Sequence, residues 1–131
     1  MMIEFFIPMK LPTITAQEQK IGVRNGKPYK YDPPELKAAR ALFRDHLAKF
    51  APLAPITGPV RLHTVWCYHS DAHKAGEWKT SKPDTDNSLK LLKDVMTGLR
   101  FWKDDAQVCS ELTDKLWADV PGLYVSVEAL A

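Results

Sequence analysis

The sequence predicts a small α/β domain of the α+β type, in which two amphipathic helices pack on one mixed sheet. Three observations support this fold class. Short β-prone runs alternate with two segments of helical periodicity, breaks rich in Pro and Gly separate them, and no internal repeat or low-complexity tract is present. The predicted order of elements is β-α-β-α-β-β. A chain of 131 residues fits one domain, which we place over 1–131.

The first fifty residues are predicted to form a strand, a long loop and a helix. Residues 2–7 are apolar and β-prone, and Pro8 ends this run. Residues 8–33 are predicted to be a long loop in which Asn25-Gly26 forms a turn. Residues 34–50 are predicted to be helical, because their apolar positions recur every three or four residues: Leu36, Ala39, Phe43, Leu47 and Phe50.

The remainder of the chain is predicted to form three strands around a second helix. A strand over 60–69 would place Trp66 and Tyr68 on the same face. Residues 105–117 and 123–128 are predicted to be the last two strands, the second with regular alternation of apolar and polar side chains. A helix over 86–97 would direct three apolar side chains inward: Leu89, Leu92 and Met96.

The charges are divided unevenly along the chain. Residues 1–82 contain 13 Lys/Arg against 7 Asp/Glu, whereas residues 83–131 contain 5 against 9. The first part could neutralise DNA phosphates and the second concentrates carboxylates, although an ordinary solvated surface is the alternative interpretation. The candidate DNA contacts lie in the long loop, on the first helix and in the loop after the third predicted element: Lys27, Lys30, Arg40, Arg44, Lys74, Lys79 and Lys82.

Several classes of protein and site are disfavoured by composition. No apolar run approaches the length of a membrane span, and the first residues lack the pattern of a signal peptide, so we expect a cytoplasmic protein. Cys67 and Cys109 form neither a disulfide framework nor a zinc motif, and we expect them to be buried free thiols. The spacing of His63, His69 and His73 likewise matches no metal-ligand motif.

Three aspartates are the candidate chemical centre. If the chain around Asp84 is extended, Asp84 and Asp86 point the same way, and Asp105 opens a strand that must return past the same helix. Clustered carboxylates repel one another, and a divalent cation removes this penalty. Because oxygen ligands favour hard ions, we expect Mg²⁺ or Mn²⁺, which suits hydrolysis of a phosphodiester.

Lys90 and Asp94 extend this polar pattern along the second helix. Lys90 lies one turn after Asp86 and could stabilise negative charge that develops on a phosphate, or orient or deprotonate the attacking water. Each residue also has a purely local interpretation. Asp84 or Asp86 could cap the helix, Lys90 and Asp94 could be a surface pair, and the doublet at 104–105 could form a turn.

Two motifs together resemble the signature of the RusA family of Holliday junction resolvases: Lys-Pro-Asp-x-Asp-Asn-x-x-Lys over 82–90 and Trp-x-Asp-Asp-x-Gln-Val over 102–108. The resemblance implies an Mg²⁺- or Mn²⁺-dependent homodimer that makes paired nicks in four-way junctions during recombination and repair. The loop around Gly26 is similar to the bacterial and prophage branch. By resemblance, the metal-binding catalytic aspartates are Asp84, Asp86 and Asp105, the catalytic-site lysine is Lys90, and Asp94 and Asp104 are supporting.

Two other functions compete with a junction-resolving endonuclease. One is a DNA-binding protein of the same fold that has lost cleavage, which is disfavoured because all four matched site residues are present. The other is a metal-dependent nucleotide phosphohydrolase, which is disfavoured because no Gly-rich phosphate loop is found. The expected dimer interface is either the first strand around Phe5 and Phe6 or the face that carries Trp66 and Tyr68.

Overall fold

The main strands form one four-stranded mixed sheet in the computed structural model, which describes residues 1–15 and 19–130. Two of its three strand pairs are antiparallel and one is parallel, so the predicted fold class is confirmed. The strands are neighbours in the order β1 (Met2–Pro8), β6 (Gly122–Ala129), β4 (Val60–Tyr68) and β5 (Val108–Trp117).

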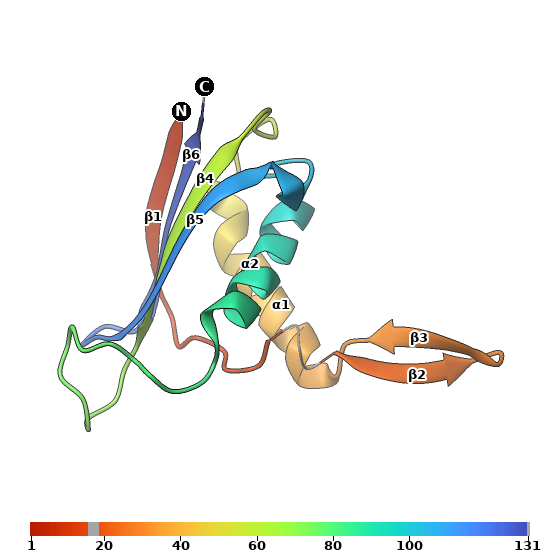
Figure 1. Cartoon of the computed structure of the whole chain (residues 1–131), viewed down its shortest axis with the longest axis horizontal. Helices are drawn as coiled ribbons and strands as arrows, with labels where there is room; N and C mark the ends of the chain where they lie inside the picture. Colours follow the sequence, from red (N-terminus) through yellow and green to blue (C-terminus); the bar gives the residue numbers. More distant parts are fainter. Residues whose placement is uncertain (16–18, 131) are drawn as a thin grey trace.

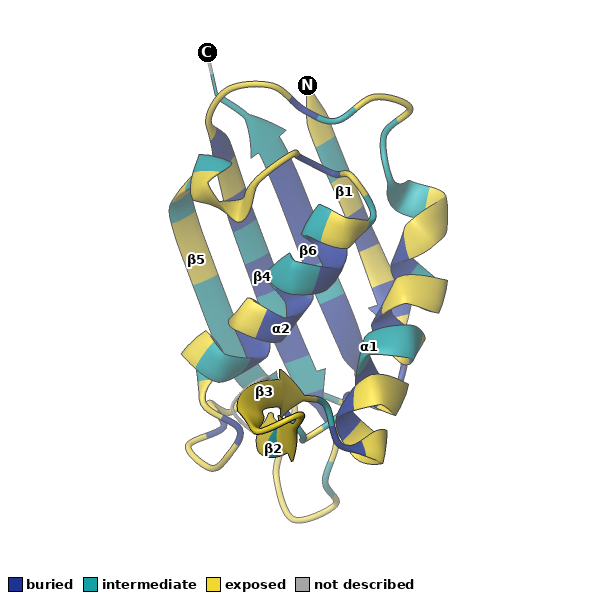
Figure 2. Cartoon of the chain, turned by 90° about the vertical axis from the view of Figure 1, so that its right-hand side faces the viewer, coloured by how far each residue is buried: buried dark blue, intermediate teal, exposed yellow. Residues whose placement is uncertain are grey.

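Both helices cover the same face of this sheet (Figures 1 and 2). α1 (Pro34–Leu47) continues into a short 3₁₀ turn, Ala48–Phe50, and α2 (Thr85–Gly98) connects β4 to β5. A crossover of this kind is needed because β4 and β5 are parallel and a tight hairpin cannot join them. The two predicted helices are confirmed to within a residue or two, apart from the 3₁₀ ending of the first. Within the described residues, neither is long and apolar enough to cross a bilayer.

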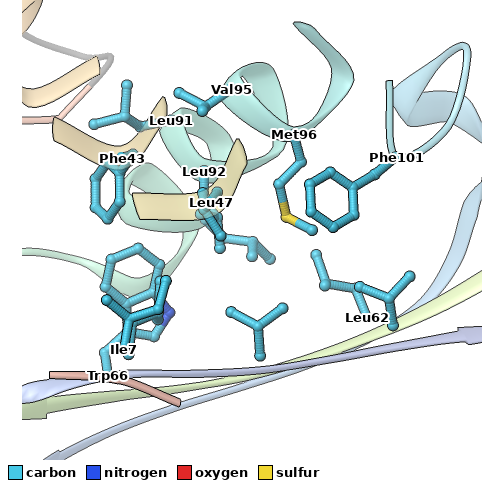
Figure 3. Packing of buried hydrophobic residues seen from close by; sticks show 14 of the residues in the cluster. Ile7, Phe43, Leu47, Leu62, Trp66, Leu91, Leu92, Val95, Met96 and Phe101 are labelled. Atoms are coloured by element: carbon cyan, nitrogen blue, oxygen red, sulfur yellow. The ribbon is translucent and has the colours of Figure 1, made fainter. Parts of the chain in front are cut away.

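The hydrophobic core lies between the helices and the sheet (Figure 3). Alternate residues of β4 point into it. Trp66 and Tyr68 share one face of the strand, as predicted, and this face is buried. Because the helices cover that face, it is not available for contact between two copies of the chain, which removes one of the two expected dimer interfaces. The residues that α1 and α2 contribute include the predicted ones: Leu36, Ala39, Phe43, Leu47, Leu89, Leu92 and Met96.

Among the described residues, no helix covers the opposite face of the sheet (Figure 1). Phe6 on β1 and Leu112 on β5 point to this uncovered face and are 41% and 53% exposed. Cys67 also lies there and is half-buried, which raises the pKa of its thiol. Cys109, at the start of β5, is exposed. Both thiols are free as predicted, but the expectation that both are buried was wrong. Cys67 faces the uncovered side of the sheet, and Cys109 lies on β5, which is an edge strand.

The predicted loop over 8–33 contains a β-hairpin. β2 (Lys20–Arg24) and β3 (Lys27–Tyr31) pair antiparallel across Asn25-Gly26, where both residues have positive φ, 53° and 73°. That dipeptide is a strong signal for a two-residue hairpin turn. The two strands were not predicted from the sequence. They contain Lys, Gly and Pro and almost all of their residues are exposed, so they show no periodicity of buried apolar residues. The hairpin extends away from the body of the protein on its helix-covered side (Figure 1). Residues 16–18 of the predicted loop lie outside the described residues.

Candidate active site

The first motif surrounds the start of α2. Asp84 occupies the N-cap position, and its main-chain carbonyl accepts a hydrogen bond from the Ser88 amide at 3.1 Å. Its carboxylate makes no capping hydrogen bond. Helix capping therefore explains why the backbone of Asp84 lies at the start of α2, but it does not explain why the side chain is an aspartate. Asp86 lies in the first turn, where the helix dipole favours a negative charge.

Two lysines hold the chain segment that leads into Asp84. Lys115 on β5 donates to the carbonyl oxygens of Ser81 and Pro83 at 2.5 and 2.7 Å. Lys79 donates to the Ser81 hydroxyl at 2.7 Å and also to the Lys82 carbonyl. Three successive carbonyls before the helix therefore have charged donors, which immobilises the backbone that carries the first aspartate.

Lys79 is enclosed within the protein. Its side chain lies between the rings of Tyr68 and Trp117, with the ammonium 5.0 Å from each centroid, and the residue is 9% exposed. Burial, and next the neighbouring charge of Lys115, lower the pKa of Lys79. An ammonium with these partners is not free to reach a phosphate, so Lys79 is a structural lysine and not the DNA contact that the sequence suggested.

The second motif forms a short 3₁₀ turn, Asp105–Gln107, and not the beginning of a strand as predicted. Asp104 caps this turn by accepting a hydrogen bond from the Ala106 amide at 2.9 Å. The Gln107 side chain accepts from the Lys103 and Asp104 amides and donates to the carbonyls of Ile56 and Gly58 at 2.9 and 3.0 Å. These bonds explain most of the motif, since they fix the turn and leave the carboxylate of Asp105 uncommitted.

The two motifs meet at a cavity of about 220 Å³ between α2 and the start of β5. Asp86 and Asp105 both line it, together with Lys90, so the structure brings together three of the four predicted catalytic residues. Asp84 is not among the residues that line it. The remaining lining residues are Leu89, Lys93 and Glu111.

Glu111 is a site residue that the sequence did not indicate. It pairs with Leu62 across the parallel ladder, so it points to the helix-covered side, where it forms a 2.5 Å ion pair with Lys93. A charged residue at an inward position of a strand is unusual, and this could have served as a signal. That signal depends on knowing where β5 begins, which the sequence placed three residues too early.

The carboxylates near the site divide into paired and unpaired groups. Asp94 is paired with Lys90 at 3.8 Å and with Arg40 at 3.6 Å. Among the described residues, by contrast, the side chains of Asp84, Asp86 and Asp105 have no hydrogen-bonding or ionic partner. Lys90 is 65% exposed, which leaves its ammonium accessible from the cavity mouth. The unpaired aspartates are the three that the sequence assigned to metal binding.

The donor set fits a hard divalent cation, although no complete metal-binding group is preformed. Within the described part of the chain, no three His, Cys, Asp or Glu side chains are arranged to hold an ion. Mg²⁺ characteristically takes only one or two protein carboxylates and completes its octahedron with water and substrate phosphate. The cavity pair, Asp86 and Asp105, meets this requirement with oxygen ligands alone, and Asp84 lies two residues away in the chain.

The other predicted DNA contacts differ in accessibility. Most of them are exposed: Lys27, Lys30, Arg44, Lys74 and Lys82. Arg40, in contrast, is partly buried, and its guanidinium pairs with Asp32 at 2.7 Å and also contacts Asp94. Its side chain is 19% exposed. Arg40 therefore links elements of the fold, and Arg44 is the arginine of α1 that is free to contact DNA.

The aromatic and imidazole side chains near the motifs are used within the protein. Trp102 is fully buried, and its indole donates to Thr97 at 2.8 Å. Each of the three histidines in question has a protein partner. His63 contacts Asp114 at 3.6 Å, His69 contacts the Ala118 carbonyl at 3.0 Å, and the ring of His73 stacks on Trp117.

Comparison with known proteins gives one family model and two relatives. The model described as Endodeoxyribonuclease RusA matches residues 12–128. A protein of Lactococcus phage r1t, named crossover junction endodeoxyribonuclease rusA, is 43% identical over 51 residues, which cover 38% of this chain and 39% of the phage protein. The uncharacterised protein YqaN of Bacillus subtilis (strain 168) is 30% identical over 123 residues, covering 84% of this chain and 85% of YqaN. The family match includes both motifs, whereas the match to the phage protein spans well under half of that relative.

Proposed function

The chain belongs to the RusA family of endodeoxyribonucleases, and from this membership we propose that it is a metal-dependent nuclease that resolves four-way (Holliday) junctions. The observation that carries the proposal is the cavity in which Asp86 and Asp105 meet beside Lys90. These residues come from separate elements, and both carboxylates are free of protein partners. Two exposed, unpaired carboxylates that line one cavity are available as oxygen ligands for a hard cation, which supports a metal site there.

In this proposal Asp86 and Asp105 hold Mg²⁺ or Mn²⁺, with Asp84 as the third carboxylate. The ion, when bound, neutralises the phosphate, activates water and stabilises the leaving oxygen. The protein's own part is to position these carboxylates. The clamp of Lys79 and Lys115 fixes the segment before Asp84, and the Asp104 cap fixes the turn that carries Asp105.

Lys90 supplies a positive charge at the cavity mouth. Its pairing with Asp94 at 3.8 Å is long for a hydrogen bond, and its ammonium is largely exposed, so it can turn towards a bound phosphate at little cost. There it would stabilise the charge that develops as the phosphodiester is cleaved. We assign Asp94 a supporting role, because it pairs with Lys90 and also contacts Arg40.

The proposed nuclease acts as a two-fold dimer. In the described part of one chain, Asp86 and Asp105 line one cavity, whereas resolving a four-way junction needs two symmetric nicks, and a closed dimer would provide two equivalent sites. The uncovered face of the sheet, which includes Phe6, supports this assembly more than the helix-covered face does. Branched DNA would then contact both copies, which doubles the basic surface available to it.

A cleavage assay on defined DNA tests the proposed function. The purified full chain is incubated with a labelled four-way junction and with a linear duplex of the same sequence, each with Mg²⁺ and with EDTA. Symmetric nicks in the junction alone, dependent on Mg²⁺ and lost in Asp105→Asn, are expected. Tight junction binding without cutting in Mg²⁺ or Mn²⁺ would favour the inactive DNA-binding alternative. Hydrolysis of free nucleotides without attack on DNA would favour the phosphohydrolase.

A further inference from the structure

We propose that the β2–β3 hairpin is an arm that grips branched DNA, with one face, defined by Lys20, Arg24, Lys27, Tyr29 and Tyr31, lying against bases exposed at the branch point. This cationic aromatic face is distinct from the acidic cavity. The inference rests on the proposed function in taking branched DNA as the ligand, but it concerns binding and not cleavage.

The hairpin carries a charge that suits a polyanion. Residues 20–31 contain four basic side chains and no acidic one, whereas the whole chain has a formal net charge of only +2. No ion pair within the described residues neutralises any of these four side chains. An exposed, uncompensated cluster of this kind attracts phosphates by Coulomb forces and by release of counterions.

The strand register sorts the hairpin side chains onto two different faces. Lys20 pairs with Tyr31, Gly22 with Tyr29 and Arg24 with Lys27, so these six residues share one face. The opposite face carries the alternate pairs. Its members are Ile21 with Lys30 and Val23 with Pro28. The aromatic rings and three of the four basic residues are therefore gathered on the first face.

The two tyrosines of the cationic aromatic face form an open platform. The rings of Tyr29 and Tyr31 are 5.7 Å apart and tilted by 38°, and the residues are 37% and 39% exposed. The Arg24 guanidinium lies 4.8 Å from the centroid of Tyr29. Gly22 leaves room for this ring, since a Cβ there would approach it to 2.9 Å. Exposed aromatic rings flanked by cations are how proteins stack on bases without selecting a sequence.

The arm is tied to the helix that carries the catalytic-site lysine. At its base, Asp32 accepts a hydrogen bond from Gln19 at 3.0 Å and pairs with Arg40 at 2.7 Å. Arg40 also contacts Asp94, which pairs with Lys90. A continuous series of polar contacts thus runs from the root of the hairpin to Lys90 at the acidic cavity, and it links the arm to α2.

The ligand that fits this surface has phosphates and accessible base faces close together. A continuous duplex offers phosphates, but its base pairs are stacked on both sides. At a branch point stacking is interrupted, so aromatic side chains can reach base faces there. Stacking contributes about 1–3 kcal/mol per base, whereas each phosphate contact adds affinity for junction and duplex alike. The tyrosines should therefore confer preference for branched DNA, and the lysines general affinity.

Binding measurements without cleavage separate these contributions. Anisotropy is followed for a labelled four-way junction and a matched linear duplex in EDTA, for wild type and for the double variant Tyr29→Ala/Tyr31→Ala. We expect the double variant to lose about tenfold or more in junction affinity, in line with the energy of stacking one base, and less than about twofold in duplex affinity. A 2-aminopurine at the branch point should change its fluorescence when wild type binds and not when the variant binds.

Lys27 and Lys30 are a matched pair of controls, because both carry one charge on β3 and lie on opposite faces of the hairpin. Lys27→Ala should lower the salt dependence of junction binding by about 0.9, and Lys30→Ala by clearly less. Equal effects of the two lysine variants, or equal losses for junction and duplex in the tyrosine variant, would overturn the inference. Because the measurements are made in EDTA, a failure to cleave in Mg²⁺ would contradict the proposed nuclease and leave the arm intact.

Discussion

Asp104 and Asp105 are adjacent in the chain, yet their carboxylates belong to different parts of the structure. Asp104 caps a 3₁₀ turn through the Ala106 amide at 2.9 Å, and Asp105 lines the cavity shared with Asp86. The cap is local and holds the main chain in the conformation that presents the second carboxylate. The doublet therefore combines a structural residue with a candidate metal ligand, and the two should respond differently to substitution.

Replacing a cavity aspartate should abolish cleavage and leave DNA binding intact. Asp86→Asn and Asp105→Asn each remove a metal ligand and a charge that repels phosphate, so junction affinity should be unchanged or higher. Asp84→Asn should behave in the same way if it is the third ligand. We expect cleavage to fall by about 100-fold or more, measured under single-turnover conditions in Mg²⁺.

Asp104→Asn is the matched control for these variants, since Asn is also a good cap. It should retain most of the cleavage rate and unfold within about 0.5 kcal/mol of wild type. If Asp104→Asn were the more damaging change of the doublet, the roles assigned to the two residues would have to be exchanged.

The choice of metal should follow the carboxylate donor set. Mg²⁺ and Mn²⁺ should support cutting, whereas Ca²⁺ should support junction binding with little or no cutting, because its larger and looser coordination suits hydrolysis poorly. Cleavage gels and anisotropy with each ion provide the test. Efficient cutting in EDTA, or stimulation by Zn²⁺ alone, would contradict the assignment of Asp86 and Asp105 as ligands.

Substitutions of Lys79 and Lys74 should have different effects on stability and on DNA binding, although both residues lie in the segment between β4 and α2. Lys79→Met removes the donor for the Ser81 hydroxyl and the Lys82 carbonyl, and the loss of these part-buried hydrogen bonds should cost about 1 kcal/mol or more of stability. Lys74→Met changes an exposed side chain and should be nearly neutral for unfolding. Denaturant titration measures the stability, and the salt dependence of junction binding should fall only for Lys74. A fall for Lys79 with unchanged stability would restore it as a DNA contact.

Substitutions of Arg40 and Arg44, which lie one turn apart on α1, should also have different effects on stability and on DNA binding. Arg40→Ala leaves the partly buried carboxylates of Asp32 and Asp94 without their shared cation and should cost about 1 kcal/mol of stability. Arg44→Ala should leave stability unchanged and reduce the salt slope of DNA binding by about 0.9 if it contacts one phosphate. Thermal unfolding and binding at several salt concentrations distinguish the two outcomes.

The proposed dimer should depend on the uncovered face of the sheet. Phe6→Glu would put a charge into an apolar contact there and should shift the chain from dimer to monomer in sedimentation at micromolar concentration. The matched change Leu53→Glu, at a fully exposed site outside the sheet, should leave the assembly unchanged. A wild-type chain that is monomeric and binds the junction as one chain per molecule would contradict paired nicking.

Local sequence rules were sufficient for most of the elements. The helices over Pro34–Leu47 and Thr85–Gly98 follow from residues that recur every three or four positions, β6 follows from regular alternation, and β4 follows from a β-prone run. The motif residues could also be identified, because runs such as Lys-Pro-Asp-x-Asp-Asn-x-x-Lys are read directly along the chain. The strands of the β2–β3 hairpin were not predicted, because a strand without a buried face shows no apolar periodicity.

The sequence by itself determined the candidate catalytic residues and the segments that contain them: Asp84, Asp86, Lys90 and Asp105, around one helix and one turn. Only the tertiary structure decided which of them meet. Glu111 joins the cavity through the register of the parallel ladder, and Lys79 is buried because Tyr68 and Trp117 close over it from different strands. Such placements depend on contacts between residues distant in the chain. Local periodicity predicts neither the register in which two strands pair nor the burial of a long polar side chain.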